Sequence, residues 1–381
     1  MSTETTVVAR TGRTAPRGLK PAAHSSPRGL KPAAHSSPRG LKRAAHSSPR
    51  GLKPAALVAT GCLLLGLTAC GPTSFVITPV PAEQELREQV VLRESAWATK
   101  KIALVDVDGI LRNARERSML TGSGENPVSL FAEKLDQAAK DDSVRAVVLR
   151  INSPGGTVTA TDLMYAEVRS FRQRTGKPVV ACMLDVAASG GYYLACAADR
   201  IYAHPTTVTG SIGVIMVAPE FTGTMQKLGV RANVFKSGPL KDAGSMFREL
   251  NDADRAVFQG LIDGMYAGFL EVVAAARPGI EAERLKQLAD GRVYLGAEAV
   301  KLGLVDETGT LHDAIFAAKG LAGLSDKAVK VVEYARPLGY RPNVYAQTDG
   351  SPAQVNLINV GLPEWLSNPS PQLMYLWAPG W

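Results

Sequence analysis

The chain has 381 residues, of which 45% are apolar and 20% are charged, and this suits one large globular domain with extensions. The formal net charge of +8 would fit a polyanion-binding protein. However, residues 1–69 carry eleven of the 43 basic residues and one of the 35 acidic residues, so the remainder is close to neutral. We therefore expect the folded part to bind no nucleic acid.

Residues 1–54 form a basic leader that is built from eleven-residue repeats. Three nearly identical units span residues 16–26, 27–37 and 38–48, and a truncated fourth unit follows them. Because the units are rich in Pro, Gly and Ser, they cannot bury a core, and we predict that the leader is disordered. A recent tandem duplication, or a start codon placed too early, would explain the repeats.

An apolar run at residues 55–69 follows the leader and is preceded by Arg50 and Lys53. It is too short to span a bilayer comfortably but suits the hydrophobic region of a signal peptide. The run leads into Leu-Thr-Ala-Cys-Gly, which resembles a bacterial lipobox with Cys70 as the lipidated first residue of the mature chain. An ordinary signal peptide or a short anchor helix is the alternative. We expect a lipid-anchored protein of the bacterial cell envelope, folded outside the cytoplasm, on either the inner or the outer membrane.

Residues 70–97 lack a clear hydrophobic period and are predicted to be a tether. Residues 98–325 alternate between strand and helix patterns, which favours an α/β domain with a mostly parallel sheet. The expected strands cover residues 102–107, 146–151, 179–184, 201–203, 213–217, 230–235, 292–294 and 304–306. The expected helices cover residues 127–139, 157–174, 190–198, 220–228, 251–288 with an interruption near Pro278, and 297–301.

Residues 326–381 are predicted to form a C-terminal extension that is rich in Pro and aromatic residues. Its Trp365, Trp377 and Trp381 indicate a tail that packs on another surface, for example that of a neighbouring subunit. 

Two cysteines follow Cys70, namely Cys182 and Cys196, and both lie in apolar runs. We expect them to be buried like small hydrophobic residues. A disulfide between them is possible in an oxidising compartment, and the sequence leaves that question open.

The most informative stretch of the chain surrounds Ser189, which is followed at once by Gly190 and Gly191. The strand predicted at 179–184 runs into this serine, and a predicted helix leaves it. The backbone N–H groups of a first helical turn lack partners within the helix and can stabilise an oxyanion. The pattern therefore predicts a nucleophilic serine, although a Gly-rich turn that caps a helix would give the same sequence.

A serine nucleophile needs a base. The chain after Cys70 contains two histidines, His204 in a turn-like stretch and His312 in the last helix, and neither gives good support for a Ser-His-Asp triad. Lys241 follows a Gly-Pro turn at the end of a predicted strand. A lysine acts as a base near neutral pH only if burial lowers its pKa by about 3 units, which takes about 4 kcal/mol. Considered alone, Lys241 would be a surface lysine.

Five blocks, taken in order, resemble the signal peptide peptidase A (SppA) family of serine peptidases in its single-repeat form. They span residues 188–193, 197–201, 209–214, 236–242 and 290–294. The resemblance covers about residues 100–320, and Met246 stands where relatives often have Pro. It implies an α/β, ClpP/crotonase-like fold of repeated βα units.

The resemblance also implies roles for individual residues. Ser189 matches the nucleophile and Lys241 the general base. Ser211 matches a serine that orients the lysine amine, with a strand-edge hydroxyl as the alternative. Gly156 (or, as the second choice, Gly155) and Gly190 match the backbone donors of the oxyanion hole. No cofactor is implied, and no His/Cys/Asp cluster has metal-ligand spacing.

The activity that the resemblance implies is that of a membrane-tethered serine endopeptidase with a Ser/Lys dyad. Its expected substrates are peptides, namely signal-peptide remnants or membrane-protein fragments. We expect a homo-oligomer in which Ser189 and Lys241 can come from different subunits. The alternatives are a catalytically silent scaffold or binding protein with the same fold, and a crotonase-type acyl-CoA enzyme.

Overall fold

The computed structural model describes residues 85–114, 117–118, 122–123, 125–336 and 372–378, all of which belong to the compact unit Thr78–Trp381. The leader, the apolar run at 55–69 and the predicted lipidation site Cys70 lie outside the described residues. So do Trp365 and Trp381 of the C-terminal extension.

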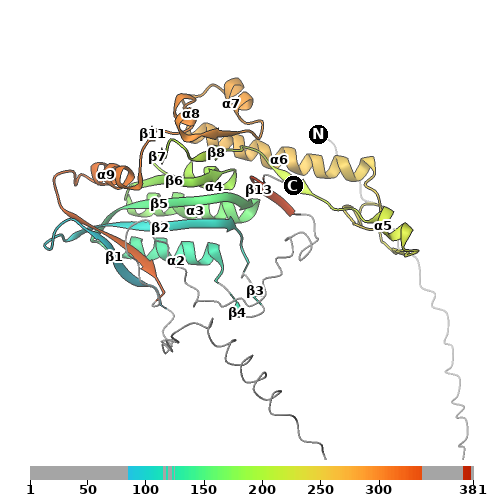
Figure 1. The fold of residues 1–381 in the computed structure, drawn as a ribbon, viewed down its shortest axis with the longest axis horizontal. Coiled ribbons are helices and arrows are strands. Elements are labelled where there is room, and N and C mark those ends of the chain that lie inside the picture. Colours follow the sequence, from blue (N-terminus) through green and yellow to red (C-terminus); the bar gives the residue numbers. More distant parts are fainter. Residues whose placement is uncertain (1–84, 115–116, 119–121, 124, 337–371, 379–381) are drawn as a thin grey trace, which may run out of the picture. The chain divides into compact units, whose positions relative to one another are not determined.

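A largely parallel sheet forms the centre of the domain (Figure 1). Its main strands are β2 (Lys100–Leu111), β5 (Val144–Thr157), β6 (Val179–Ala188) and β7 (Arg200–Ala203), and each pairs in parallel with the next. The sheet is open, with β11 (Glu307–Thr308) beyond β7, and does not close into a barrel. This arrangement confirms the expected α/β fold class.

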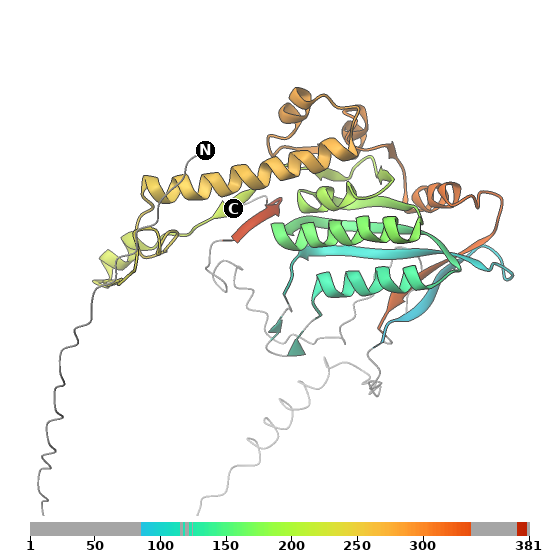
Figure 2. The same cartoon turned by 180° about the vertical axis from the view of Figure 1, so that it is seen from behind.

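Helices cover both faces of the sheet (Figures 1 and 2). On one face, α2 (Pro127–Lys140), α3 (Val158–Thr175) and α4 (Gly190–Ala195) pack in the larger core, and on the other face α9 (Leu311–Leu321) packs in a second core. Successive residues of β5 belong to opposite cores, as a strand's period of two requires. Because both faces are buried, the central strands read as continuous apolar runs.

Local signals set the helix ends. Asn126 caps α2, since its side chain accepts hydrogen bonds from the N–H groups of Val128 and Ser129, and Pro127 occupies the first helical position. Gly176 ends α3 in the left-handed conformation, with φ of 64°. The helices predicted at 127–139 and 157–174 are confirmed within two residues at each end.

An arm extends past the end of the sheet (Figures 1 and 2). It contains β9 (Ile215–Val217), α5 (Thr222–Lys227) and the long helix α6 (Asp252–Ala276). The strand predicted at 230–235 is wrong: these residues form neither helix nor strand, and the side chain of Phe235 is 98% exposed. The apolar residues at 230–235 have no strand partner within the described chain.

Smaller elements complete the described domain. Strand β8 (Val208–Gly210) pairs with both β6 and β10 (Val293–Leu295). The strand expected at 304–306 forms later, as β11. The remaining elements are α7 (Ala282–Leu288), α8 (Gly296–Lys301) and the antiparallel pair of β3 (Arg117–Ser118) and β4 (Gly122–Ser123).

The two ends of the described chain add strands that the sequence analysis did not predict. Strand β1 (Arg87–Arg93), within the predicted tether, pairs antiparallel with β12 (Val329–Ala335), and β12 pairs in parallel with β2. Strand β13 (Gln372–Leu376), within the predicted extension, pairs with β5 and β9. These pairings join residues far apart in the chain, so no local pattern announces them.

A buried ionic cluster links β5, at the centre of the sheet, to β2, β12 and α2. The fully buried Arg150 of β5 donates from Nε to Oδ1 of Asp106 on β2 at 2.6 Å. Its Nη2 lies 3.9 Å from Oε2 of the buried Glu333 on β12, and Nζ of Lys134 on α2 lies 3.7 Å from Oδ2 of Asp106. The cluster thus ties three strands and one helix together.

Helix α6 is, within the described residues, the one helix that is long and apolar enough to cross a membrane by length and composition. Its C-terminal part belongs to the domain core, where Phe269 and Val273 are fully buried. Most of the rest of the helix surface is exposed or half-buried.

Candidate active site

Ser189 lies where β6 ends and α4 begins, and its backbone is strained. Its φ and ψ are 51° and −114°, and among the described residues only Ser189 and Ser211 (φ 49°) are non-glycine residues with positive φ. Two hydrogen bonds hold this geometry: the Ser189 N–H donates to the Gly210 carbonyl at 2.7 Å, and the Ser189 carbonyl accepts from the Tyr193 N–H at 2.9 Å. Strain of this kind concentrates at functional sites.

The hydroxyl of Ser189 is buried, and Oγ has no hydrogen-bond partner within the described part of the chain. The side chain makes no capping hydrogen bond to α4, which speaks against a simple capping role. Oγ1 of Thr161, on the first turn of α3, is likewise buried without a partner in that part. Buried hydroxyls are normally paired, so this site has unused hydrogen-bonding capacity.

The loop at the end of β5 lies against the first turn of α4. A Cβ atom on Gly155 would lie 2.7 Å from the Gly190 nitrogen, so the two segments are in close contact. A Cβ atom on Gly156 would lie 1.9 Å from the Leu111 carbonyl oxygen, and one on Gly190 would lie 2.7 Å from Oγ1 of Thr161. Both of the glycines predicted to supply oxyanion donors therefore stand where a side chain does not fit.

The amide of Gly155 is already occupied. Its N–H donates to Oγ of Ser153 at 3.1 Å, and that hydroxyl donates to the Gly109 carbonyl at 2.6 Å. This internal bonding favours Gly156 over Gly155 as the loop donor.

Ser211 immediately follows Gly210, whose carbonyl binds the Ser189 N–H. Its side chain is buried, and its own N–H donates to the Arg292 carbonyl at 2.7 Å. Strand β8 thus places the second predicted serine beside the first through backbone bonds. The structure therefore places Ser189, Gly190 and Ser211 on neighbouring segments, with the loop of Gly155 and Gly156 against Gly190.

Lys241 is not part of this group within one chain. It is exposed, it lies in the segment between α5 and α6, and it makes no hydrogen bond to Oγ of Ser189. Figures 1 and 2 both show α5 and the start of α6 beyond the end of the sheet.

Ion pairs order the segment that carries Lys241. Nζ of Lys236 lies 2.7 Å from Oδ1 of Asp242, and Nη2 of Arg248 lies 2.9 Å from the same oxygen. Arg248 also pairs with the buried Asp254, the residue that completes the capping box of α6 with Asn251. Hydrogen bonds from Arg248 and then from Lys236 hold the pKa of Asp242 well below its usual value.

The remaining candidates lie elsewhere. His204 and His312 are exposed, and neither binds Oγ of Ser189. Cys182 and Cys196 are free and buried, and burial raises the pKa of each thiol to about 12. Within the described ranges no cluster of three or more His, Cys, Asp or Glu side chains could hold a metal ion.

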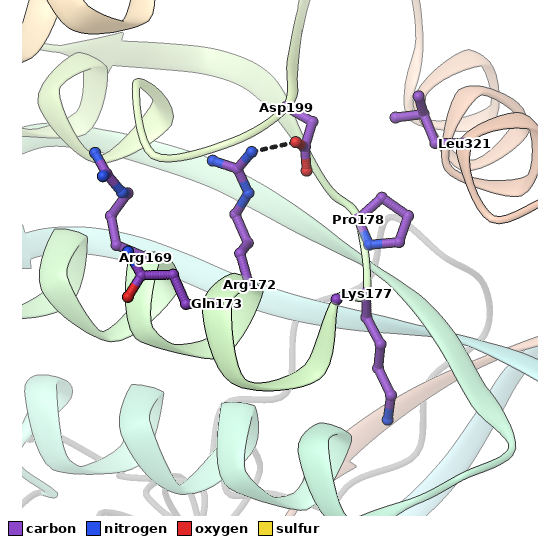
Figure 3. Close-up of a pocket in the computed structure, with 8 residues that line it drawn as sticks. Arg169, Arg172, Gln173, Lys177, Pro178, Asp199 and Leu321 are labelled. Carbon is purple, nitrogen blue, oxygen red and sulfur yellow. Dashed lines mark hydrogen bonds and ion pairs between the residues drawn. The ribbon is translucent and has the colours of Figure 1, made fainter.

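A basic pocket of about 470 Å³ lies beside the start of β6 (Figure 3). Two of its three basic side chains already have partners within the domain. Arg172 pairs with Asp199, and Nζ of Lys177 donates to the carbonyls of Ala138 and Asp141 at 2.8 and 2.9 Å. These contacts explain both residues without a ligand.

Three aromatic rings whose contact the sequence did not predict form a cluster, namely Tyr375 of β13, Tyr193 of α4 and Phe269 of α6. Tyr193 stood in a recognised block, but nothing local connects it with residues so far along the chain. The cluster forms because β13 pairs with the end of β5.

Comparisons with known proteins agree with this geometry. The model of peptidase family S49 matches residues 171–325, and that of Clp protease matches residues 104–209. The domain is therefore a serine-type peptidase with a ClpP-like fold. 

Relatives with protease names support this family assignment. A candidate protease of Synechocystis sp. is 36% identical over 268 residues, which cover 70% of this chain and 90% of the relative. A candidate signal peptide peptidase SppA of Enterococcus faecium is 34% identical over 250 residues, covering 66% and 71%. Protease 4 of Haemophilus influenzae is 36% identical over 221 residues, covering 58% and 35%. The chain belongs to peptidase family S49, and the resemblance to SppA peptidases is confirmed.

Proposed function

We propose that this chain is a membrane-tethered serine endopeptidase with a Ser/Lys dyad, which cleaves signal-peptide remnants or membrane-protein fragments. The observation that carries the proposal is Ser189 itself: its backbone is strained, and its buried hydroxyl, next to the first N–H of α4, has no hydrogen-bond partner among the described residues. A serine peptidase needs a nucleophile, and we propose that Ser189, at the turn from β6 into α4, supplies it. The name of the Enterococcus relative supports the substrate class.

The proposed chemistry uses groups of the chain itself. Neutral Lys241 takes the proton from Ser189 as the hydroxyl attacks a peptide carbonyl, and the N–H groups of Gly156 and Gly190 stabilise the oxyanion. Lys241 then protonates the leaving amine, and water hydrolyses the acyl-enzyme with the same lysine as base. Ser211, held beside Ser189 by strand β8, is proposed to orient the lysine amine.

A second copy of the chain is proposed to deliver Lys241. The arm that carries this lysine exposes large apolar side chains, among them Phe235 at 98%, Leu228 at 72% and Val230 at 52%. An exposed apolar surface of this kind is typical of a protein interface. Burial of the arm against another copy would also supply the desolvation that lowers the pKa of a lysine. We therefore propose a homo-oligomer whose active sites are shared between neighbours.

The membrane attachment is proposed to be lipid on Cys70, which lies outside the described residues. The exposed apolar surface of α6 offers a second possible contact with a bilayer, by its length and composition alone. Under this proposal the peptidase domain lies outside the cytoplasm.

A fluorophosphonate probe tests the dyad and the shared site together. We expect it to label Ser189 in the parent protein and to fail with either Ser189→Ala or Lys241→Ala. Mixed and reassembled, these two inactive variants should regain about a quarter to a half of the labelling, because an intact serine can meet an intact lysine of a neighbour. Lys301→Ala, on the exposed side of α8, is the matched control and should label normally.

Three results would contradict the proposal in different ways. A folded parent that does not react at all would favour the catalytically silent scaffold. Labelling that survives Lys241→Ala would remove lysine as the base. Full activity of a strictly monomeric protein on dilution would remove the shared site.

A further inference from the structure

Thr161, on the first turn of α3, is fully buried, yet its Oγ1 has no hydrogen-bond partner among the described residues. Thr175 of the same helix shows the usual arrangement, because its hydroxyl donates to the Phe171 carbonyl one turn earlier at 2.8 Å. The buried Thr209 of β8 likewise donates to the Ala187 carbonyl at 2.7 Å. Burying a hydroxyl without a partner is costly, so the unused donor of Thr161 points to a function.

The Thr161 hydroxyl lies at the junction between the loop that ends β5 and the first turn of α4. A Cβ atom on Gly190 would be 2.7 Å from Oγ1 of Thr161 and 3.0 Å from the α-carbon of Gly155. Gly190 supplies one of the two proposed oxyanion donors, and Gly156, next to Gly155, supplies the other. Ser189 directly precedes Gly190, and its hydroxyl also lacks a partner in the described part of the chain. Two hydroxyls with unused hydrogen-bonding capacity therefore adjoin the Gly190 amide.

Contacts of its neighbours in the chain hold Thr161 in place against α4. Asp162, the next residue, accepts a hydrogen bond at 2.7 Å from the hydroxyl of Tyr193, which belongs to α4. Ala160, the preceding residue, and Met164, one turn later, are buried in the larger core. The hydroxyl is thus carried by a rigid helix turn. A donor that is fixed in advance stabilises a developing charge well, because nothing has to reorganise when the charge appears.

We propose that the hydroxyl of Thr161 is a third donor of the oxyanion hole, beside the N–H groups of Gly156 and Gly190. As Ser189 attacks a peptide carbonyl, negative charge develops on the carbonyl oxygen, and the O–H of Thr161 donates a hydrogen bond to it while keeping its proton. When the tetrahedral intermediate collapses, the charge and this hydrogen bond are lost together. Such a bond accelerates the reaction because it is strongest in the transition state. The inference rests on the proposed peptidase function.

Thr161→Val in the full-length protein tests the inference, because valine keeps the branched shape of the side chain and removes the donor. With a fluorogenic peptide that the parent cleaves, we expect kcat to fall about a hundredfold and KM to change less than about twofold. Thr161→Ser retains the hydroxyl and should keep kcat within about threefold of the parent. The pH at which activity is half-maximal should be the same in all three proteins, since Thr161 is not the base.

Thermal unfolding separates this role from a structural one. Thr161→Val removes a buried hydroxyl that has no partner in the described structure, so we expect its unfolding midpoint to rise by about 2–4 °C. Thr175→Val is the matched control on the same helix: it loses the hydrogen bond to Phe171, so its midpoint should fall while kcat stays unchanged. If Thr161→Val instead lost stability together with activity, the hydroxyl would be a structural group, and the inference would be overturned.

The kinetic outcomes separate this inference from the proposed function. An active parent together with a Thr161→Val variant of equal kcat would overturn the third donor and leave the peptidase standing. A raised KM at unchanged kcat would assign the hydroxyl to the binding of the ground state, and this too would overturn the third donor alone. A folded parent that neither cleaves peptides nor reacts with a fluorophosphonate would remove the peptidase, and the third donor with it.

Discussion

At the scale of single residues, the site depends on two serines whose backbones adopt a conformation that favours glycine. Ser189 and Ser211 have φ of 51° and 49°, and a backbone hydrogen bond to Gly210 links the segments that carry them. Such a conformation costs about 1–3 kcal/mol for a residue with a side chain. The hydrogen bonds that the Ser189 backbone makes with Gly210 and Tyr193 hold this conformation.

Replacement of this serine by glycine should therefore make the protein more stable and inactive at once. We expect Ser189→Gly to raise the free energy of unfolding by about 1 kcal/mol, since glycine adopts the positive φ without strain. Ser189→Ala keeps the strain and should leave stability almost unchanged. Chemical denaturation of the three proteins measures the difference. Equal stability of the Gly and Ala variants would show that the turn stores no strain.

At the scale of structural elements, the segment between α5 and α6 is held by charge rather than by a core. Apart from its ends it is largely exposed, and its order depends on Arg248, which bridges Asp242 and Asp254. This gives Lys241 a defined position while leaving its side chain open to another molecule. The apolar side chains nearby are available for the same contact.

Arg248→Gln should reduce probe labelling of Ser189 by about tenfold or more, because misplacing a reacting group costs that much, while thermal unfolding of the core changes little. Unaltered labelling by Arg248→Gln would show that the ion pairs do not position Lys241.

The ion pairs of Asp242 should weaken only in strongly acidic solution. The pKa of Asp242 is lowered from 3.8, so the contribution of its ion pairs is complete above that value and is lost only as the pH falls further through the lowered pKa. Loss of activity in mildly acidic solution must then come from another group.

At the scale of the whole molecule, the sequence predicted the elements that local patterns define and not the strands whose partners lie far along the chain. Most strands and helices from Ile102 to Lys301 follow from apolar runs, caps and turn residues, although β8 and the β3–β4 pair were not predicted. The serine and its glycines could be found from their spacing. Strands β1, β12 and β13 could not be placed, because each is defined by a partner far along the chain. The strand expected at 230–235 failed for the complementary reason: its apolar residues have no partner strand in the described chain.

The buried ionic cluster gives a prediction at this same scale. Asp106→Asn should destabilise the domain by about 3–5 kcal/mol, because it leaves the fully buried Arg150 without its main counter-charge. Replacing all four members of the cluster by apolar residues should recover most of that loss, because no charge of the cluster remains. The substitutions are Asp106→Leu, Lys134→Met, Arg150→Met and Glu333→Leu. Denaturant unfolding of the parent and both variants checks this, and a single variant as stable as the parent would contradict it.

The pairing of Arg87 with Ala335 has a consequence for how the enzyme would sit in a cell envelope. Sixteen residues separate Cys70 from Arg87, and a chain of that length reaches about 60 Å at most. With a lipid on Cys70, the corner of the sheet at Arg87 would thus be held within that distance of the bilayer. Strand β12 ends at this same corner, so the chain that leads to β13 leaves the sheet where the anchored segment enters it.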